Sequence, residues 1–118
     1  MTTAESIFTK VDRQDTAALI ELFAEDATMV FGNGEPLLGR EAILAGNNGF
    51  LQTIKGLRHS LIEEWTVGTT TVAVTDITYT RRDDKEVTIP GVSIWRVGED
   101  GLITDYRVFF DPSPIYAP

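Results

Sequence analysis

The feature that most constrains the fold of this chain is a change in hydrophobic periodicity between its two halves. In the second half, four segments alternate apolar and polar residues with a period of two, which is typical of β-strands with one buried face. The strings LRHSLIEEWTV and TTVAVTDITYT flank the turn dipeptide GT, and VTIPGVSIWRV and LITDYRVFF flank GEDG. These short turn-forming links predict two β-hairpins, and hence a meander of long antiparallel strands over residues 57–110.

The first half instead carries apolar residues at helical spacing. The stripe of the first expected helix is Ala4, Ile7, Phe8 and Val11. A second helix is expected over residues 13–27, with Asp15 as its N-cap, and a short strand at 28–31. Residues 39–54 predict a weaker helix, because the run GNNG interrupts its apolar pattern.

Helices followed by a meander of strands are typical of an α+β domain. We expect residues 1–118 to form a single domain, in which a curved antiparallel or mixed sheet wraps around about three N-terminal helices. A sheet curled around helices leaves a conical space between the two layers. A cavity of that kind is a natural site for a ligand.

The composition excludes several classes of function. The chain has 18 acidic and 10 basic residues, a net charge of −8, so nucleic acids and anionic membranes would repel it. It contains no cysteine, which excludes disulfides, thiolate catalysis and cysteine-bound zinc. Because there is one histidine and no glycine-rich phosphate loop after a strand, we expect no metal site and no cofactor.

The hydropathy pattern also bears on location. No segment approaches the ~20 continuous apolar residues that a membrane-spanning helix needs. The N-terminal stretch MTTAESIFTK lacks the basic start and the apolar run of a signal peptide. We therefore expect a cytoplasmic protein.

Three stretches of the chain resemble a known superfamily. DTAALIELFAEDATMVF, GREAI and GVSIWRVGEDGLITDYRVFFD are similar to the nuclear-transport-factor-2-like superfamily, and in particular to its SnoaL-like domain family. The resemblance spans nearly the whole chain and implies a cystatin-like cone with a pocket. It does not imply one activity, because the superfamily includes ketosteroid isomerases, limonene-epoxide hydrolases, polyketide cyclases, scytalone dehydratases and members that are not enzymes.

The catalytic positions of those relatives are occupied here by other residue types. The general base and the protonated aspartate of ketosteroid isomerases fall on Phe31 and Ser93. The Asp–Arg–Asp constellation of limonene-epoxide hydrolases falls near Thr78, Asp76 and Val108, and the aspartate of SnoaL-type cyclases also falls at about Val108. Any chemistry in this chain therefore has to come from other residues.

Strand geometry supplies two candidate catalytic residues. In a symmetric hairpin around VGTT, the numbers of paired residues add up to 137, so His59 faces Thr78 and Leu61 faces Asp76. His59 and Asp76 are then diagonal neighbours on one face of the sheet. An aspartate beside an imidazole can fix its tautomer and make it a general acid or base. The alternative is that His59 only begins its strand and bonds to a carbonyl group or to solvent.

The rest of the expected pocket is apolar and aromatic, and the alternative is a cone filled by its own side chains. The candidate substrate-binding residues are Met29, Phe31, Thr78, Ser93, Trp95, Tyr106 and Val108. A four-residue loop in RRDDK places Asp76 on their face, whereas a five-residue loop would reverse the face. Asp111 precedes a proline, so we expect it to end the last strand rather than to catalyse.

The sequence thus predicts a small-molecule enzyme or binder for a compact apolar organic ligand. If it is catalytic, we expect isomerase, cyclase, dehydratase or epoxide-hydrolase chemistry through His59 and Asp76. The rival hypothesis is a non-catalytic ligand-binding or dimeric interaction module. The opposite face of the sheet is expected to be broad and apolar, which fits a sheet-to-sheet homodimer. The residues expected on that face are Thr75, Ile77, Tyr79, Ile94, Arg96, Arg107 and Phe109.

Overall fold

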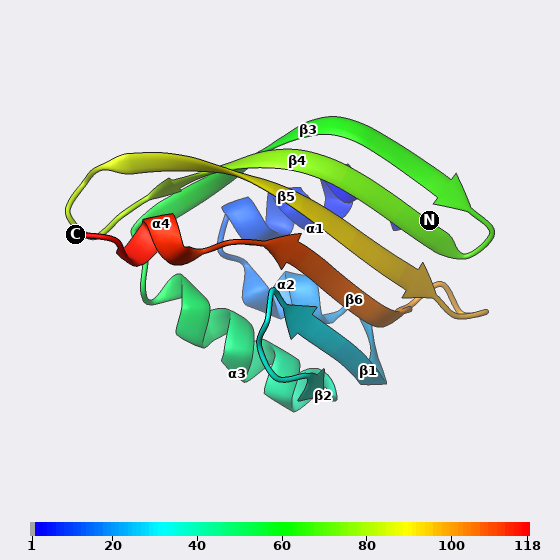
Figure 1. Cartoon of the computed structure of the whole chain (residues 1–118). Coiled ribbons are helices and arrows are strands. Elements are labelled where there is room, and N and C mark those ends of the chain that lie inside the picture. Colours follow the sequence, from blue (N-terminus) through cyan, green and yellow to red (C-terminus); the bar gives the residue numbers. More distant parts are fainter. Residues whose placement is uncertain (1) are drawn as a thin grey trace.

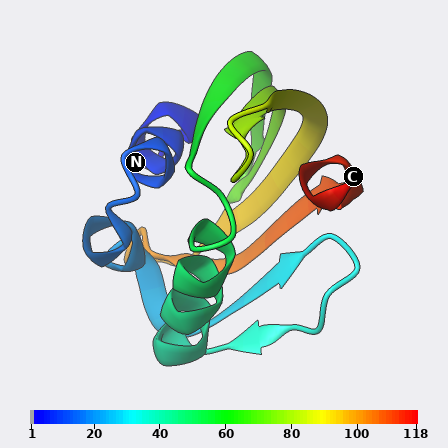
Figure 2. The ribbon, with the colours of Figure 1, turned by 90° about the vertical axis from the view of Figure 1, so that its left-hand side faces the viewer.

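A computed structural model describes residues 2–118 and shows a six-stranded sheet that curves around three helices (Figures 1 and 2). The strand order is β2-β1-β6-β5-β4-β3, and every neighbouring pair is antiparallel except β1 and β6. The elements are α1 (Ala4–Asp12), α2 (Thr16–Ile20), β1 (Phe23–Phe31), β2 (Leu37–Leu38), α3 (Arg40–Leu51), β3 (Gly56–Val67), β4 (Thr70–Thr80), β5 (Glu86–Val97), β6 (Ile103–Phe110) and α4 (Ser113–Tyr116). The expected α+β cone is confirmed.

The helix starts follow the capping chemistry of the sequence. Thr3 accepts a hydrogen bond from the Ser6 backbone N–H at 3.1 Å, and Asp15 accepts one from Ala18 at 3.1 Å. The second helix is much shorter than expected, because α2 ends at Ile20 and β1 already begins at Phe23. The Leu22 carbonyl accepts the Ile103 N–H at 2.8 Å, so pairing with β6 overrides the helical spacing here.

The long strands agree with the expected hairpins, but their register does not agree throughout. From Glu63 to Val67, paired residues of β3 and β4 add up to 137, as in Glu63 opposite Val74. A bulge at Ile62 then shifts the register, so that Leu61 lies opposite Thr75. This shift reverses which residues of β3 share a face with which residues of β4.

The other two hairpins complete the assignment of faces. A five-residue loop, 81–85, joins β4 to β5 and places Thr75 opposite Gly91. Between β5 and β6, Trp95 lies opposite Tyr106 rather than Thr104, a slip of two residues that leaves both on the expected face.

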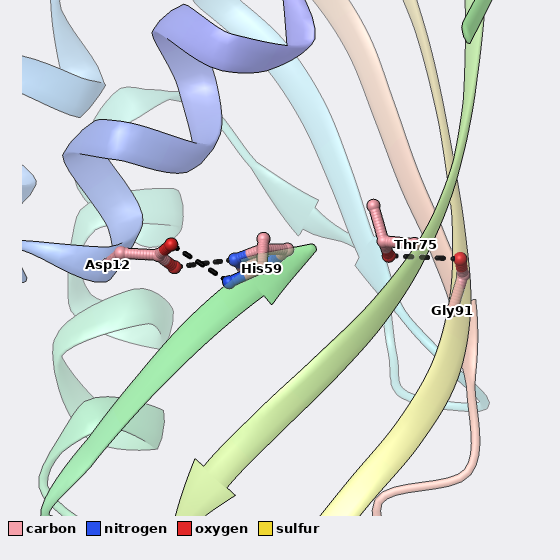
Figure 3. Close-up of polar contacts among 4 residues, drawn as sticks. All are labelled: Asp12, His59, Thr75 and Gly91. Carbon is pink, nitrogen blue, oxygen red and sulfur yellow. Dashed lines mark hydrogen bonds and ion pairs between the residues drawn. The ribbon is translucent and has the colours of Figure 1, made fainter. Parts of the chain in front are cut away.

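The concave face of β4 therefore carries the odd-numbered residues. The expectation that Thr75, Ile77 and Tyr79 point away from the helices was wrong, since all three are buried. The Thr75 hydroxyl donates to the Gly91 carbonyl at 3.1 Å (Figure 3). The residues that do lie on the convex face, as expected, are Ile94, Arg96, Arg107 and Phe109.

The segment after β6 packs back onto the domain. Asp111 Oδ1 accepts the Ser113 N–H at 3.0 Å, and this bond holds the pKa of Asp111 below its usual range. Ile115 of α4 is buried in a cluster that includes Ile77 and Tyr79. The Arg81 guanidinium donates hydrogen bonds to the carbonyls of Pro114 and Ala117. These bonds hold α4 against that cluster. No helix of the described chain is long and apolar enough to cross a membrane.

Candidate active site

The concave face of the sheet and the helices enclose a small apolar cavity. Its volume is about 50 Å³, counted as the space that the centre of a water molecule can occupy. A single water needs roughly 10–15 Å³ by this measure, so the cavity has room for a compact group of a few heavy atoms. Its aromatic lining residues are Phe8, Phe23, Phe31, Phe50, Tyr79, Tyr106 and Phe110. Its polar lining residues are Asn47, His59 and Ser93.

Most of the residues predicted for the pocket lie in two adjacent rows across the concave face. Met29, Tyr106 and Trp95 form one row, and Phe31, Val108 and Ser93 form the next. Five of these six line the cavity; the sixth, Trp95, is fully buried and stacks on Tyr106, with ring centroids 5.7 Å apart.

Asp76 and Thr78 lie on the opposite face of the sheet. Asp76 pairs with Ser60 and Pro90, and the Thr78 hydroxyl bonds to that of Thr88 at 3.0 Å. The expected pairing of His59 with Asp76 and the expected place of Thr78 in the pocket were therefore wrong. The bulge at Ile62 and the five-residue loop are the physical reasons, because each changes strand parity.

His59 nevertheless has a carboxylate partner, which is Asp12 at the end of α1 (Figure 3). Asp12 Oδ1 lies 2.6 Å from His59 Nδ1, and Asp12 Oδ2 accepts the backbone N–H of His59 at 2.9 Å. The side chain of His59 is 10% exposed, and that of Asp12 is 25% exposed. This double contact fixes the imidazole on the carboxylate with its Nδ1–H as the donor.

Sequence reasoning missed Asp12 because 47 residues separate it from His59. One signal was present, since Asp12 is an acid in the last turn of a helix. The negative end of the helix dipole disfavours a carboxylate there, so such a residue is expected to have a compensating partner.

The imidazole ring also packs against an aromatic ring of α1. Phe8 stacks on His59 with centroids 4.2 Å apart and an angle of 4° between the planes. Phe8 meets Trp95 edge-on at 6.4 Å, and Trp95 stacks on Tyr106. A continuous line of rings thus connects the Asp12–His59 pair to Tyr106.

The His59 side chain lies between two spaces and lines both of them. On one side it lines the apolar cavity, and on the other it lines an open cleft of about 300 Å³ together with Glu5, Thr9 and Asp12. His59 Nε2 has no partner among the described residues. Among residues 2–118, the buried side-chain nitrogen and oxygen atoms without a hydrogen-bond partner are Arg81 Nε and Trp95 Nε1. His59 Nε2 is not one of them, so it is accessible.

The tyrosines of the cavity keep their protons at neutral pH. Burial raises the pKa of Tyr106 to about 12, against a weaker opposing interaction with Ser93. Burial also raises the pKa of Tyr79 above its ordinary value. Both hydroxyls are therefore suited to donate hydrogen bonds to an oxygen atom of a ligand.

Asn47 is a second polar residue that sequence reasoning missed. It lies on α3, is buried, and donates from Nδ2 to the Ile43 carbonyl at 2.9 Å and to Met29 Sδ at 3.4 Å. Its amide oxygen is left to accept a hydrogen bond. In residues 2–118, no three histidine, aspartate or glutamate side chains are grouped so that they could hold a metal ion.

A family model described as a SnoaL-like domain matches residues 4–106. No curated protein matches the chain significantly. Three of the similar solved structures define the likeness further.

The first is a protein of ketosteroid isomerase-like fold from Catenulispora acidiphila, in complex with trimethylamine; it has 19% identity and a TM-score of 0.85, over 97% of this chain and 91% of that one. The second is TerC co-crystallised with polyporic acid, with 18% identity and a TM-score of 0.80, over 92% and 88%. The third is an LEH-like epoxide hydrolase of M. tuberculosis, with 13% identity and a TM-score of 0.77, over 95% and 82%. At these identities the likeness concerns the fold.

Proposed function

The chain belongs to the SnoaL-like domain family, and from this premise we propose that it is a small-molecule enzyme whose general acid/base is His59, oriented by Asp12. The observation that carries the proposal is the 2.6 Å contact between Asp12 Oδ1 and His59 Nδ1 at the wall of the cavity. With Nδ1 engaged, the lone pair of Nε2 is free to accept a proton.

The reaction class that fits this arrangement is proton transfer on a carbonyl compound. His59 Nε2 takes a proton from the carbon next to the carbonyl, and the electron pair moves onto the carbonyl oxygen, which Tyr106 stabilises by donating a hydrogen bond. The imidazolium returns that proton to another carbon, giving an isomer, or to a leaving hydroxyl, giving water and a dehydrated product. The Asp12 carboxylate stabilises the imidazolium through its contact with Nδ1.

The chemistry of the lining supports a compact ligand without charge. The residues that line the cavity are mostly apolar and aromatic, and no lysine or arginine is among them. An anion would find no countercharge there and would lose its hydration. One similar structure is a complex with trimethylamine and another was co-crystallised with polyporic acid, which supports a small organic molecule as the ligand of this chain.

The second candidate function is binding without catalysis. The lining favours it, because the residues that line the cavity include no aspartate, glutamate, lysine or arginine. The volume of about 50 Å³ limits either function to a compact ligand, since known sites for drug-sized ligands are roughly 300–1,000 Å³. A binder would take up a compact ligand and leave it unchanged. It would also be indifferent to the loss of Asp12.

The imidazole itself provides the test. We would label the protein with ¹⁵N, assign the tautomer of His59 from its long-range ¹H–¹⁵N correlations, and add ketones, epoxides and lactones of increasing size. The expected result is a proton on Nδ1 in the wild type and in Asp76→Asn, loss of that preference in Asp12→Asn, and a shift of Nε2 on ligand addition. An imidazole with a proton on Nε2, or one that no compound shifts, would refute the acid/base proposal.

We also propose that the protein forms a homodimer through the convex face of the sheet. Exposed apolar side chains lie on that face, with Trp65 48% and Phe109 45% exposed. Glu63 is on the same face, and the Arg107 guanidinium lies 4.7 Å from the centre of the Phe109 ring. This surface carries both signs of charge around an apolar centre. A second copy related by a two-fold axis can therefore cover the apolar side chains and pair acidic with basic residues.

A further inference from the structure

We propose that Phe50 determines the size of the ligand that the cavity accepts. This inference rests on the proposed function, because it assumes that the cavity holds a ligand. The cavity is small because aromatic rings fill its interior, and Phe50 is the centre of the group that does so.

Three cavity-lining rings surround Phe50. Its centroid lies 6.0 Å from that of Phe31, 5.9 Å from that of Tyr79 and 6.5 Å from that of Phe110. The rings of Tyr79 and Phe110 are nearly perpendicular to it, at 88° and 82°. The two buried clusters of the domain meet at this ring, since Phe31 packs on one of them and Tyr79 belongs to the other.

Phe50 differs from its neighbours in what holds its backbone. Phe31, Tyr79 and Phe110 belong to strands β1, β4 and β6, whose backbones are fixed by the ladder of the sheet. Phe50 lies in the last turn of α3, which ends at Leu51, and is only partly buried. It is therefore the one ring of the four that can be replaced without changing a strand of the sheet.

The sequence before Phe50 weakens this part of the helix. Gly46 and Gly49 both lie inside α3, and glycine lowers helix stability more than any residue except proline. A Cβ added at Gly49 would meet no atom within 4 Å, so the helix is exposed at this position, whereas Phe50 lines the cavity. The backbone that carries Phe50 is thus weaker than the strands that carry the other three rings.

The test compares Phe50→Ala with Phe109→Ala. Phe109 is a phenylalanine on the convex face and does not line the cavity, so its truncation is a matched control. Binding of cyclopentanone, cyclohexanone, 1-indanone and 1-tetralone would be followed by NMR through the His59 ring signals. We expect the wild type and Phe109→Ala to bind the monocyclic ketones only, and Phe50→Ala to bind the bicyclic ones at least tenfold more tightly than the wild type does.

Two further measurements keep this inference separate from the proposed function. Phe50→Leu would be used if Phe50→Ala does not fold, with the same direction expected and a smaller effect. Naphthalene is the second probe, because it matches the bicyclic ketones in size and needs only space: Phe50→Ala should bind it and the wild type should not, even if no ketone binds to either protein. That result would reject the proposed ligand class and support the role of Phe50. Exclusion of both the bicyclic ketones and naphthalene by a folded Phe50→Ala would overturn the inference.

Discussion

Asp12 and His59 are joined by two contacts between α1 and β3: Oδ1 lies 2.6 Å from Nδ1, and Oδ2 accepts the backbone N–H at 2.9 Å. The carboxylate therefore holds both the ring and the main chain of the histidine. A ring that is also stacked on Phe8 has little freedom to turn. The free nitrogen of the imidazole is thus kept in place before any ligand arrives, which is the preorganisation that acid/base catalysis requires.

Asp12→Asn should lower both stability and any turnover. The amide keeps the shape of the carboxylate but loses its charge, and we expect the free energy of unfolding to fall by about 1 kcal/mol, since Asp12 is partly exposed. Urea unfolding of the variant and the wild type would measure this loss. Asp76→Asn is the control, because that residue lies on the convex face, and it should stay within about 0.5 kcal/mol of the wild type. Equal stability of the two variants would contradict the role given to Asp12.

His59→Gln should remove catalysis while leaving ligand binding intact. Glutamine can occupy the same space and can still donate a hydrogen bond to Asp12, but it cannot take up a proton. We expect turnover of any compound that proves to be a substrate to fall by about 10²–10⁴-fold, which is the usual contribution of a general acid or base. Steady-state kinetics and ligand titration on the same samples would separate the two effects. A variant that retains full turnover would exclude His59 as the acid/base.

Tyr106→Phe should change how stability depends on alkaline pH. The pKa of Tyr106 is raised from 10.0 to about 12 in the folded protein, so the unfolded chain loses this proton first as pH rises. The stabilising contribution is therefore complete below pH 10 and is lost between pH 10 and about 12. At about 1.4 kcal/mol per pH unit, the loss reaches roughly 3 kcal/mol.

Thermal unfolding of the wild type and Tyr106→Phe between pH 8 and 11 would measure this difference. The wild type should lose stability more steeply above pH 10, because the variant has one buried hydroxyl fewer to titrate. Tyr79 remains in both proteins, and its raised pKa adds the same slope to each. Parallel curves would show that Tyr106 is not buried as described.

Gly49→Ala and Gly46→Ala should have opposite effects on α3. Alanine at residue 49 would meet no neighbouring atom, and we expect about 0.4–1 kcal/mol of added stability from the lower entropy of the unfolded chain. At residue 46 the new Cβ would lie 2.5 Å from Leu37 Cδ1, so the side chain of Leu37 has to move and stability should fall. Chemical denaturation of both variants is a direct check. Stabilisation by Gly46→Ala would mean that α3 and β2 pack less closely than described.

Trp65→Asp and Phe109→Asp should convert the proposed homodimer into a monomer. Each places a carboxylate in the apolar centre of the convex face, where it would be desolvated in the dimer. Analytical ultracentrifugation over a range of protein concentrations would give the assembly state. Leu38→Asp is the matched control, because Leu38 is exposed on the short strand β2 and should leave the dimer intact. A wild type that sediments as a monomer at all concentrations would reject the dimer.

The hairpins could be predicted from the sequence because their signals are local. Alternation with period two, interrupted by GT and GEDG, gave β3, β4 and β6 to within one residue of their observed bounds. The side chains of β5 and β6 that face the helices could be predicted from the same pattern. Ser93, Trp95, Tyr106 and Val108 lie on the expected face.

Strand faces and catalytic partners depended on contacts that no local pattern contains. The bulged residue Ile62 places His59 opposite Ile77 instead of Thr78. One extra residue in the loop 81–85 places Asp76 opposite Pro90, on the other side of the sheet from Ser93. Likewise, pairing of Leu22 with Ile103 ended α2 early and extended β1.

The sequence by itself thus determined the class of fold, the long strands and the aromatic character of the cone, since these follow from periodicity and composition. The tertiary structure decided which carboxylate meets His59 and how much space the aromatic rings leave. Both depend on packing between residues far apart in the chain: Asp12 lies 47 residues from His59, and Phe50 lies 19 residues from Phe31, 29 from Tyr79 and 60 from Phe110. A change of one residue in strand register reverses a face, whereas the hydrophobic pattern that specifies the strand remains the same.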